Sequence, residues 1–142
     1  MIEEVMLDGI LRALILRRDF HRPGIHFLTP NDFSQQLGYI SHPSGHRILP
    51  HTHKDVHREV RSTQEVLVIR KGRLRVDFYG EGRVRLDSRT LETGDVILLA
   101  SGGHGFEVLE DCEMIEVKPG PYAEGQDKVR FVPLDGDAGS GS

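Results

Sequence analysis

The sequence predicts an all-β protein, and three observations carry the prediction. Turn residues recur at short intervals along the chain. The segments between them alternate apolar and polar residues or are rich in β-branched residues, as strands are. No stretch of ten residues shows the apolar stripe of an amphipathic helix. Many short strands at this spacing are typical of an antiparallel sandwich or barrel.

The expected strands follow one another with short polar connections. Two of them, 64–70 and 73–79, are expected to form a hairpin hinged at Gly72. Another two, 104–110 and 112–118, are separated only by Asp111. The full set of expected strands comprises residues 11–18, 24–29, 37–42, 64–70, 73–79, 83–87, 96–100, 104–110 and 112–118.

Length and composition indicate one soluble domain. A chain of 142 residues with 37% hydrophobic and 28% charged residues is ordinary for a globular protein. We expect a single domain over residues 1–134 and a flexible tail over 135–142, where the sequence DGDAGSGS has the composition of a linker. The net charge of −4 argues against a nucleic-acid partner, since nucleic-acid binders usually carry a basic excess.

The cysteine content and the first residues favour a cytoplasmic location. Cys112 is the single cysteine, so no internal disulfide forms. The stretch 1–20 lacks a basic leading region, and Arg12 interrupts its apolar run. It resembles neither a signal peptide nor a membrane span, and no membrane partner is expected.

A cluster of imidazoles predicts a metal site. His51 and His53 flank Thr52, so an extended backbone directs both rings to one side. Glu65 opens an apolar strand, and His104 opens another after two glycines. Three imidazoles and a carboxylate suit one divalent transition metal ion, which we expect to be Fe, Mn, Ni or Zn.

A second arrangement of the same segment is possible. His53 and His57 have the spacing of two zinc ligands on one helix face. However, this stretch follows Pro50 and lacks an apolar stripe, which disfavours a stable helix. We therefore expect His57 to lie in a loop at the rim of the site.

Taken together, these residues resemble the first motif of the cupin superfamily. That motif consists of a glycine, a His-x-His pair, a glutamate and a second glycine. Gly45, His51, His53, Glu65 and Gly72 follow this order. The eleven residues between His53 and Glu65 form a longer gap than the motif has.

The second cupin motif is matched less completely. It begins with glycine and aspartate, as Gly94 and Asp95 do, and carries the last histidine, as His104 does. Ala100 stands in place of its proline. The resemblance covers about residues 38 to 118 and implies a cupin-type double-stranded β-helix, that is, a jelly-roll barrel. It also implies that the four matched side chains are the metal ligands.

The resemblance implies a metal-dependent enzyme that acts on a small polar substrate. Chemistry of the isomerase, epimerase or lyase type on a sugar derivative is the first expectation, because similar small cupins belong to surface-polysaccharide and nucleotide-sugar gene sets. An iron-dependent dioxygenase is an alternative. A non-catalytic module that binds a small ligand or a metal is another, as is a metal site that only stabilises the barrel.

Substrate contacts are expected from polar and apolar side chains near the metal. Arg61 is the candidate for a phosphate or carboxylate, because a guanidinium binds such groups with two parallel hydrogen bonds. A homodimer is also expected, since cupins commonly pair and residues 11–18 look able to add to a neighbour's sheet. The full set of candidate substrate-binding residues is Gln36, Tyr39, His57, Arg61, Gln64 and Phe106.

Overall fold

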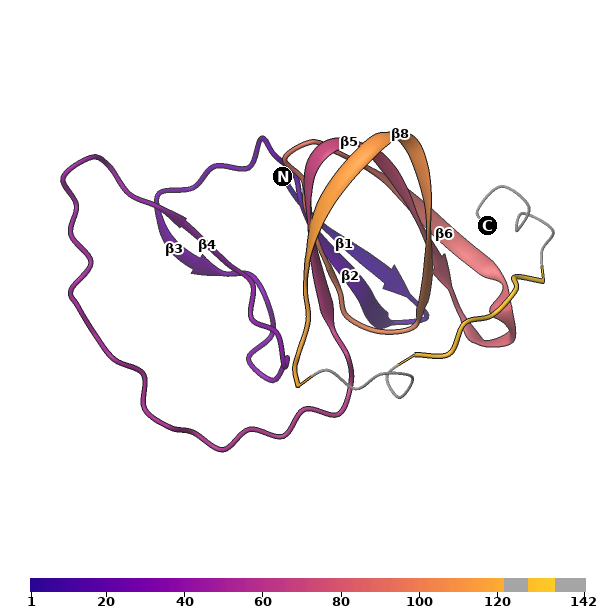
Figure 1. Ribbon diagram of the computed structural model, residues 1–142, viewed down its shortest axis with the longest axis horizontal. Coiled ribbons are helices and arrows are strands. Elements are labelled where there is room, and N and C mark those ends of the chain that lie inside the picture. The colour runs from indigo at the N-terminus through magenta and orange to yellow at the C-terminus, as the bar shows by residue number, and fades with distance from the viewer. Residues whose placement is uncertain (122–127, 135–142) are drawn as a thin grey trace.

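The computed structural model describes residues 1–121 and 128–134, and it confirms the all-β prediction. These residues contain strands and a single 3₁₀ turn but no α-helix (Figure 1). No helix among them is long and apolar enough to span a membrane. The predicted tail, 135–142, lies outside the described residues. The elements are β1 (Ile2–Leu7), β2 (Ile10–Leu16), β3 (Gly24–Phe27), β4 (Gly38–Ser41), β5 (Glu65–Tyr79), η1 (Glu81–Arg83), β6 (Arg85–Glu92), β7 (Val96–Leu99) and β8 (Gly103–Val117).

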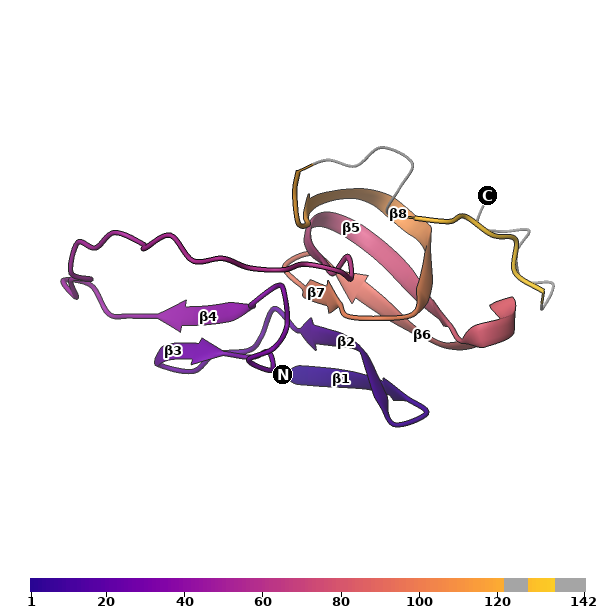
Figure 2. The ribbon, with the colours of Figure 1, turned by 90° about the horizontal axis from the view of Figure 1, so that it is seen from below.

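Six strands form one antiparallel sheet, and two form a separate pair. The order of the large sheet is β1-β2-β7-β5-β6, and β8 pairs with β5 along its other edge. Strands β6 and β7 lie one after the other along the same edge of β5, opposite residues 73–79 and 65–68. The β3–β4 pair stands apart from this sheet (Figures 1 and 2). The sheet is strongly curved, and it does not close into a barrel among the described residues.

The position of β2 corrects the expected dimer contact. This strand pairs with β1 on one side and with β7 on the other, so both of its edges are occupied. It cannot add to a neighbour's sheet, because its backbone hydrogen-bonding groups are already paired within the chain. The apolar character of residues 11–18 instead reflects burial, since Ala13 and Ile15 are both 0% exposed.

The expected hairpin at Gly72 is wrong, because residues 65–79 form one continuous strand. The strand bends at Gly72 instead of reversing. Its backbone φ is +90°, and its N–H donates to the hydroxyl of Thr93 at 3.0 Å. The two strands expected on either side of Asp111 are likewise one strand, β8. The pairing register of β5 and β8 shifts repeatedly between Ile69 and Leu74, so bulges bend both strands together.

The curvature encloses the core on one face of the sheet. The larger cluster consists of side chains from β1, β2, β5, β6 and β7, all at most 3% exposed, with Phe106 and Cys112 of β8 packed against it. A smaller cluster lies on the opposite face, where Phe33 and Leu37 from the segment around β4 cover it. The buried members of the larger cluster are Val5, Ala13, Ile15, Leu67, Ile69, Leu74, Val76, Phe78, Leu91, Ile97 and Leu99.

The Gly94–Asp95 turn has a structural role. Asp95 is 3% exposed, and its carboxylate accepts from the backbone N–H groups of Arg18 at 2.9 Å and of Glu92 at 2.8 Å. The guanidinium of Arg17 donates to the same carboxylate at 3.1 Å and to Glu3 at 2.7 Å. These bonds fix the turn between β6 and β7 against β1 and β2. A buried carboxylate needs such partners, because an unpaired one is strongly destabilising.

Replacement of Gly72 by alanine tests the bend. A Cβ at Gly72 would overlap the carbonyl oxygen of Asp111, and the φ of +90° is unfavourable for alanine. We expect Gly72→Ala to lower the free energy of unfolding by about 2–4 kcal/mol. The control is Gly82→Ala, which has a similar φ of +82° but nothing within 4 Å of a new Cβ. It should cost only about 1 kcal/mol. Urea unfolding followed by circular dichroism measures both, and equal losses would contradict a close contact at the bend.

Candidate metal and ligand site

Glu65 and His104 meet at the open end of the curved sheet. The Nε2 atom of His104 lies 3.5 Å from a carboxylate oxygen of Glu65. Their side chains are 26% and 13% exposed respectively, so solvent reaches the pair only in part. Phe106 lies beside the imidazole, with 5.4 Å between the ring centroids. The structure therefore brings together two of the four predicted metal ligands and one predicted substrate contact.

The curvature of β5 and β8 creates this contact. In the pairing register His104 lies opposite Phe78, whereas Glu65 is the first residue of β5. A flat strand would separate positions 65 and 78 by about 40 Å, at roughly 3.3 Å per residue. Both side chains point to the face of the larger core cluster, because Glu65 alternates in phase with Leu67 and His104 with Phe106. The bend turns that face inward, so that Glu65 at the start of β5 comes close to His104, which lies opposite the end of β5.

The contact alters the acid chemistry of Glu65. The hydrogen bond from His104 is the main influence, and it lowers the pKa of the Glu65 carboxyl below its ordinary value. Partial burial works in the opposite direction, while the positive charges of Lys118 and Lys128 contribute smaller lowering effects. Glu65 is therefore a carboxylate at neutral pH, which is the form that accepts hydrogen bonds and binds cations.

His51 and His53 lie elsewhere in the structure. Both belong to the segment 43–63, which connects β4 to β5 and in which every residue is exposed. Their rings are in contact with each other, with 5.1 Å between centroids. Within residues 1–121 and 128–134, no three His, Cys, Asp or Glu side chains are grouped closely enough to hold a metal ion. The predicted ligands thus form two pairs, one on the sheet and one on the segment.

His51 is nevertheless oriented as a ligand would be. Its Nδ1 lies 2.9 Å from the carbonyl oxygen of Leu49. A carbonyl only accepts hydrogen bonds, so Nδ1 carries a proton, and in the neutral ring Nε2 keeps its lone pair. Metal-bound histidines usually make such a bond through the nitrogen that does not face the metal.

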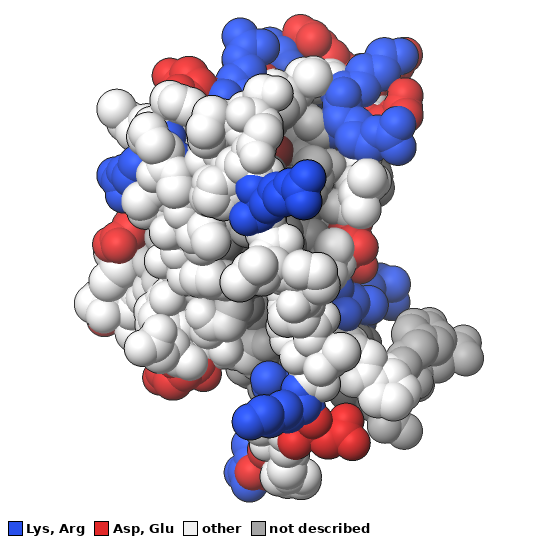
Figure 3. Space-filling model, turned by 90° about the vertical axis from the view of Figure 1, so that its left-hand side faces the viewer, with Lys and Arg blue, Asp and Glu red and all other residues white. Residues whose placement is uncertain are grey.

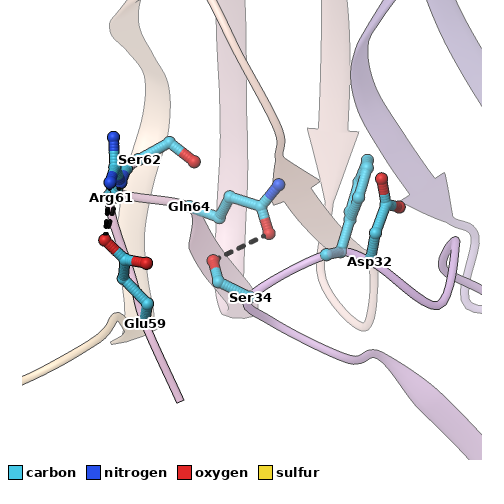
Figure 4. Close-up of a pocket in the computed structure, with 7 residues that line it drawn as sticks. Asp32, Ser34, Glu59, Arg61, Ser62 and Gln64 are labelled. Carbon is cyan, nitrogen blue, oxygen red and sulfur yellow. Dashed lines mark hydrogen bonds and ion pairs between the residues drawn. The ribbon is translucent and has the colours of Figure 1, made fainter.

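An open cleft lies where the segment joins the sheet (Figure 4). Its volume is about 380 Å³. Arg61 lines the cleft and is paired with Glu59, with 2.8 Å between the guanidinium and the carboxylate. Two of the predicted substrate contacts, Arg61 and Gln64, thus meet here, although Arg61 is 85% exposed. The residues that line the cleft are Asp32, Phe33, Ser34, Glu59, Arg61, Ser62 and Gln64.

Gln64 is held as an anchor of the segment. It is 5% exposed, and its side-chain oxygen accepts from the hydroxyl of Ser34 at 3.3 Å and from the backbone N–H of Gln35 at 3.1 Å. These bonds tie the end of the segment to the chain before β4. Sequence reasoning missed Ser34, because one serine in a turn carries no signal of a partner thirty residues away.

Gln36 and Tyr39, two further predicted substrate contacts, make their hydrogen bonds to residues other than Glu65 and His104. The side-chain amide of Gln36 bonds to Pro30 and Phe33 and accepts from Thr29 at 2.8 Å, which holds the turn before β4 together. The hydroxyl of Tyr39 lies 3.3 Å from the His21 ring. His57 is exposed on the segment 43–63.

Comparison of this chain with protein-family models, with curated proteins and with solved structures finds no match. The candidate site is therefore argued from its own residues.

Replacement of Gln64 tests whether it acts as an anchor. In Gln64→Leu the half-buried backbone N–H of Gln35 and the exposed hydroxyl of Ser34 lose the hydrogen bonds to the Gln64 oxygen. We expect the free energy of unfolding to fall by about 1–2 kcal/mol, the net contribution of one or two hydrogen bonds. The neighbouring exposed Thr63 supplies the control, since Thr63→Ala should change stability by less than about 0.5 kcal/mol. An unchanged stability in Gln64→Leu would leave substrate binding as its role.

Proposed function

We propose that this protein is a metal-dependent enzyme of the cupin type, with a jelly-roll architecture, and that it acts on a small polar substrate. The observation that carries the proposal is the contact between Glu65 and His104. The carboxylate of Glu65 in β5 and the imidazole of His104 in β8 meet at a partly buried position at the open end of the sheet. Ionisable groups that the fold brings together in this way are characteristic of functional sites.

The chemistry of the donors fits a divalent transition metal ion. Glu65 supplies a carboxylate, and His104, His51 and His53 supply imidazoles, which suit Fe, Mn, Ni or Zn. The hydrogen bond from Nδ1 of His51 to the Leu49 carbonyl leaves the other ring nitrogen, Nε2, available as a metal ligand in the neutral ring. His51 and His53 are already neighbours, so a movement of the exposed segment toward the sheet would deliver both rings together.

Such an ion would supply a Lewis acid that polarises a carbonyl or hydroxyl oxygen of the substrate. The chain itself contributes orientation and exclusion of water. The carboxylate of Glu65 lies 3.5 Å from Nε2 of His104 and would help to hold that ring in place. Phe106 covers one side of the imidazole with an apolar surface. The segment 43–63 would act as a lid over the site, since it is exposed throughout and its end is anchored at Gln64.

A sugar derivative is the proposed substrate class. Arg61 lies at the base of the segment and would meet a phosphate or carboxylate of the substrate. The ion pair with Glu59 is exposed, so an anionic ligand competes for the guanidinium at little cost. Isomerisation, epimerisation or elimination at a carbon next to a carbonyl would suit a Lewis acid with a nearby base.

A second candidate is a metal-free acid–base enzyme. The contact between Glu65 and His104 favours it, because it places an imidazole and a carboxylate side by side, as an acid–base pair requires. His104 would then remove a proton beside the substrate carbonyl, and Glu65 would stabilise the resulting imidazolium. This reading needs neither His51 nor His53, which distinguishes it from the first.

Metal content decides between the two candidates. Protein reconstituted with Fe²⁺, Mn²⁺, Ni²⁺ or Zn²⁺ and then desalted is examined by elemental analysis. We expect about one equivalent of one of these metals in the wild type, the number that a single four-ligand site takes. Loss of a ligand should weaken binding by more than about tenfold in Glu65→Gln, His104→Ala and His51→Ala. The control is His26→Ala, which removes a half-buried histidine of β3 whose ring nitrogen lies 2.7 Å from the Pro23 carbonyl oxygen.

Each result has a clear meaning. Binding that survives in His26→Ala but is lost in the other three variants supports the four-ligand site. Binding lost in Glu65→Gln and His104→Ala but retained in His51→Ala shows that the segment is not part of the site. No metal in the reconstituted wild type contradicts the metalloenzyme and leaves the acid–base pair.

A further inference from the structure

Arg12 is the one charged residue of the otherwise apolar strand β2. It lies between Leu11 and Ala13 and interrupts the apolar run of residues 1–20. The pairing register of β1 and β2 passes from Val5–Ala13 to Met6–Leu11, so Arg12 is the extra residue of a β-bulge. Bulges redirect a side chain and are frequent beside functional sites. The bulge thus gives Arg12 a direction that regular strand pairing would not.

The side chain of Arg12 lies against the turn between β7 and β8. A Cβ at Gly102 would lie 2.6 Å from Nη1 of Arg12, so the guanidinium occupies space that glycine leaves open. The carbonyl of Arg12 accepts from the backbone N–H groups of Ala100 at 2.8 Å and of Ser101 at 3.4 Å. The hydroxyl of Ser101 donates to the Leu11 carbonyl at 2.9 Å. These bonds hold the turn in place beside the guanidinium.

The guanidinium of Arg12 is covered on one side and open on the other. Its Nε is buried and has no hydrogen-bond acceptor among the described residues. Its Nη1 and Nη2 make no hydrogen bond in that part of the chain either, but they are not buried, so they face solvent. Two parallel N–H groups of this kind match the two oxygens of a carboxylate or a phosphate. Because the stem is already held, little freedom is lost when an oxyanion binds.

Arg12 lacks the carboxylate partner that other arginines of similar burial have. The described residues contain six half-buried arginines. Arg12 forms no ion pair in the described part of the chain. A partly desolvated charge is normally paired, so Arg12 suits an anion that comes from outside the chain. The five arginines that form an ion pair with an aspartate or a glutamate are Arg17, Arg73, Arg75, Arg85 and Arg89.

The charge pattern of the surface favours a small anion over a polyanion. On the face drawn in Figure 3, basic side chains lie singly or beside acidic ones and form no continuous basic surface. The net charge of −4 would also repel a large polyanion. A single oriented guanidinium therefore suits one oxyanion group of a small molecule.

We propose that Arg12 binds one carboxylate or phosphate group of a small ligand at the turn formed by residues 100–103. The backbone N–H of Gly102 donates no hydrogen bond among the described residues, so it is available to the same oxyanion. The turn leads to His104, two residues further on, so an oxyanion at Arg12 would lie on the order of 10 Å from that residue. This position is separate from the cleft that Arg61 lines. It requires no metal ion, and it does not depend on the proposed function.

Nuclear magnetic resonance of the full chain tests the proposal with two probes, inorganic phosphate and malonate. Each probe is added at constant ionic strength, and ¹H–¹⁵N spectra follow the Nε–H of Arg12 and the backbone N–H of Gly102. Burial protects the Nε proton from exchange with water, which keeps its signal observable. We expect both signals to shift and to saturate. Saturation at lower concentration by phosphate identifies a phosphate group as the ligand chemistry, and saturation at lower concentration by malonate identifies a carboxylate.

Variants show whether the guanidinium itself binds the probe. Arg12→Gln should weaken binding, followed at Gly102, by about tenfold or more, because it removes charge-assisted hydrogen bonds. Arg12→Lys should also bind more weakly, because an ammonium group cannot form two parallel bonds. The matched control is Arg58→Gln, which removes the same charge from an exposed position and should keep the wild-type affinity.

Three results would overturn the proposal. The first is a wild type in which neither probe gives a saturable shift. The second is a Gly102 shift that is unchanged in both Arg12 variants, because the anion would then bind elsewhere. The third is an equal loss of affinity in Arg58→Gln and Arg12→Gln, which would show a general attraction of anions to positive charge.

Discussion

The β5–β8 ribbon bends where Gly72 of one strand packs against Asp111 of the other, and the rest of the structure depends on this bend. Any side chain at position 72 would overlap the Asp111 carbonyl, so glycine permits an approach that other residues prevent. The bend turns a flat strip into a curved sheet around the larger core cluster. It also brings Glu65, at the start of β5, to His104, which lies opposite the end of that strand. The bend at Gly72 thus forms both the core and the candidate site.

The candidate site has a rigid half and an exposed half. The rigid half is the Glu65–His104 pair on the ribbon, and the exposed half is the segment that carries His51 and His53. This division accounts for the proposed chemistry, in which the sheet fixes one imidazole and the segment closes over a small substrate.

The sequence predicts most of the strands, because alternating burial leaves a period of two, as at Ala13 and Ile15. It misses β1 and divides β5 and β8 into two strands each. It does not distinguish a bend from a reversal at Gly72, since both require glycine, and the choice depends on the distant contact with Asp111. The proximity of Glu65 and His104 was expected from the resemblance of their segments to the two cupin motifs. The partners of Gln64 and Asp95 were not, because they come from segments far along the chain. Such contacts are properties of the folded sheet.

The contact between Glu65 and His104 is the most direct test of this account, because it follows from the bend and the candidate site is built on it. A nuclear Overhauser spectrum of uniformly ¹³C- and ¹⁵N-labelled protein measures it without any ligand. The account predicts cross-peaks between the imidazole ring protons of His104 and the side-chain protons of Glu65. Cross-peaks from that ring to Phe78 and Phe106 alone, with none to Glu65, would show that the ribbon does not bring its two ends together, and they would contradict the account.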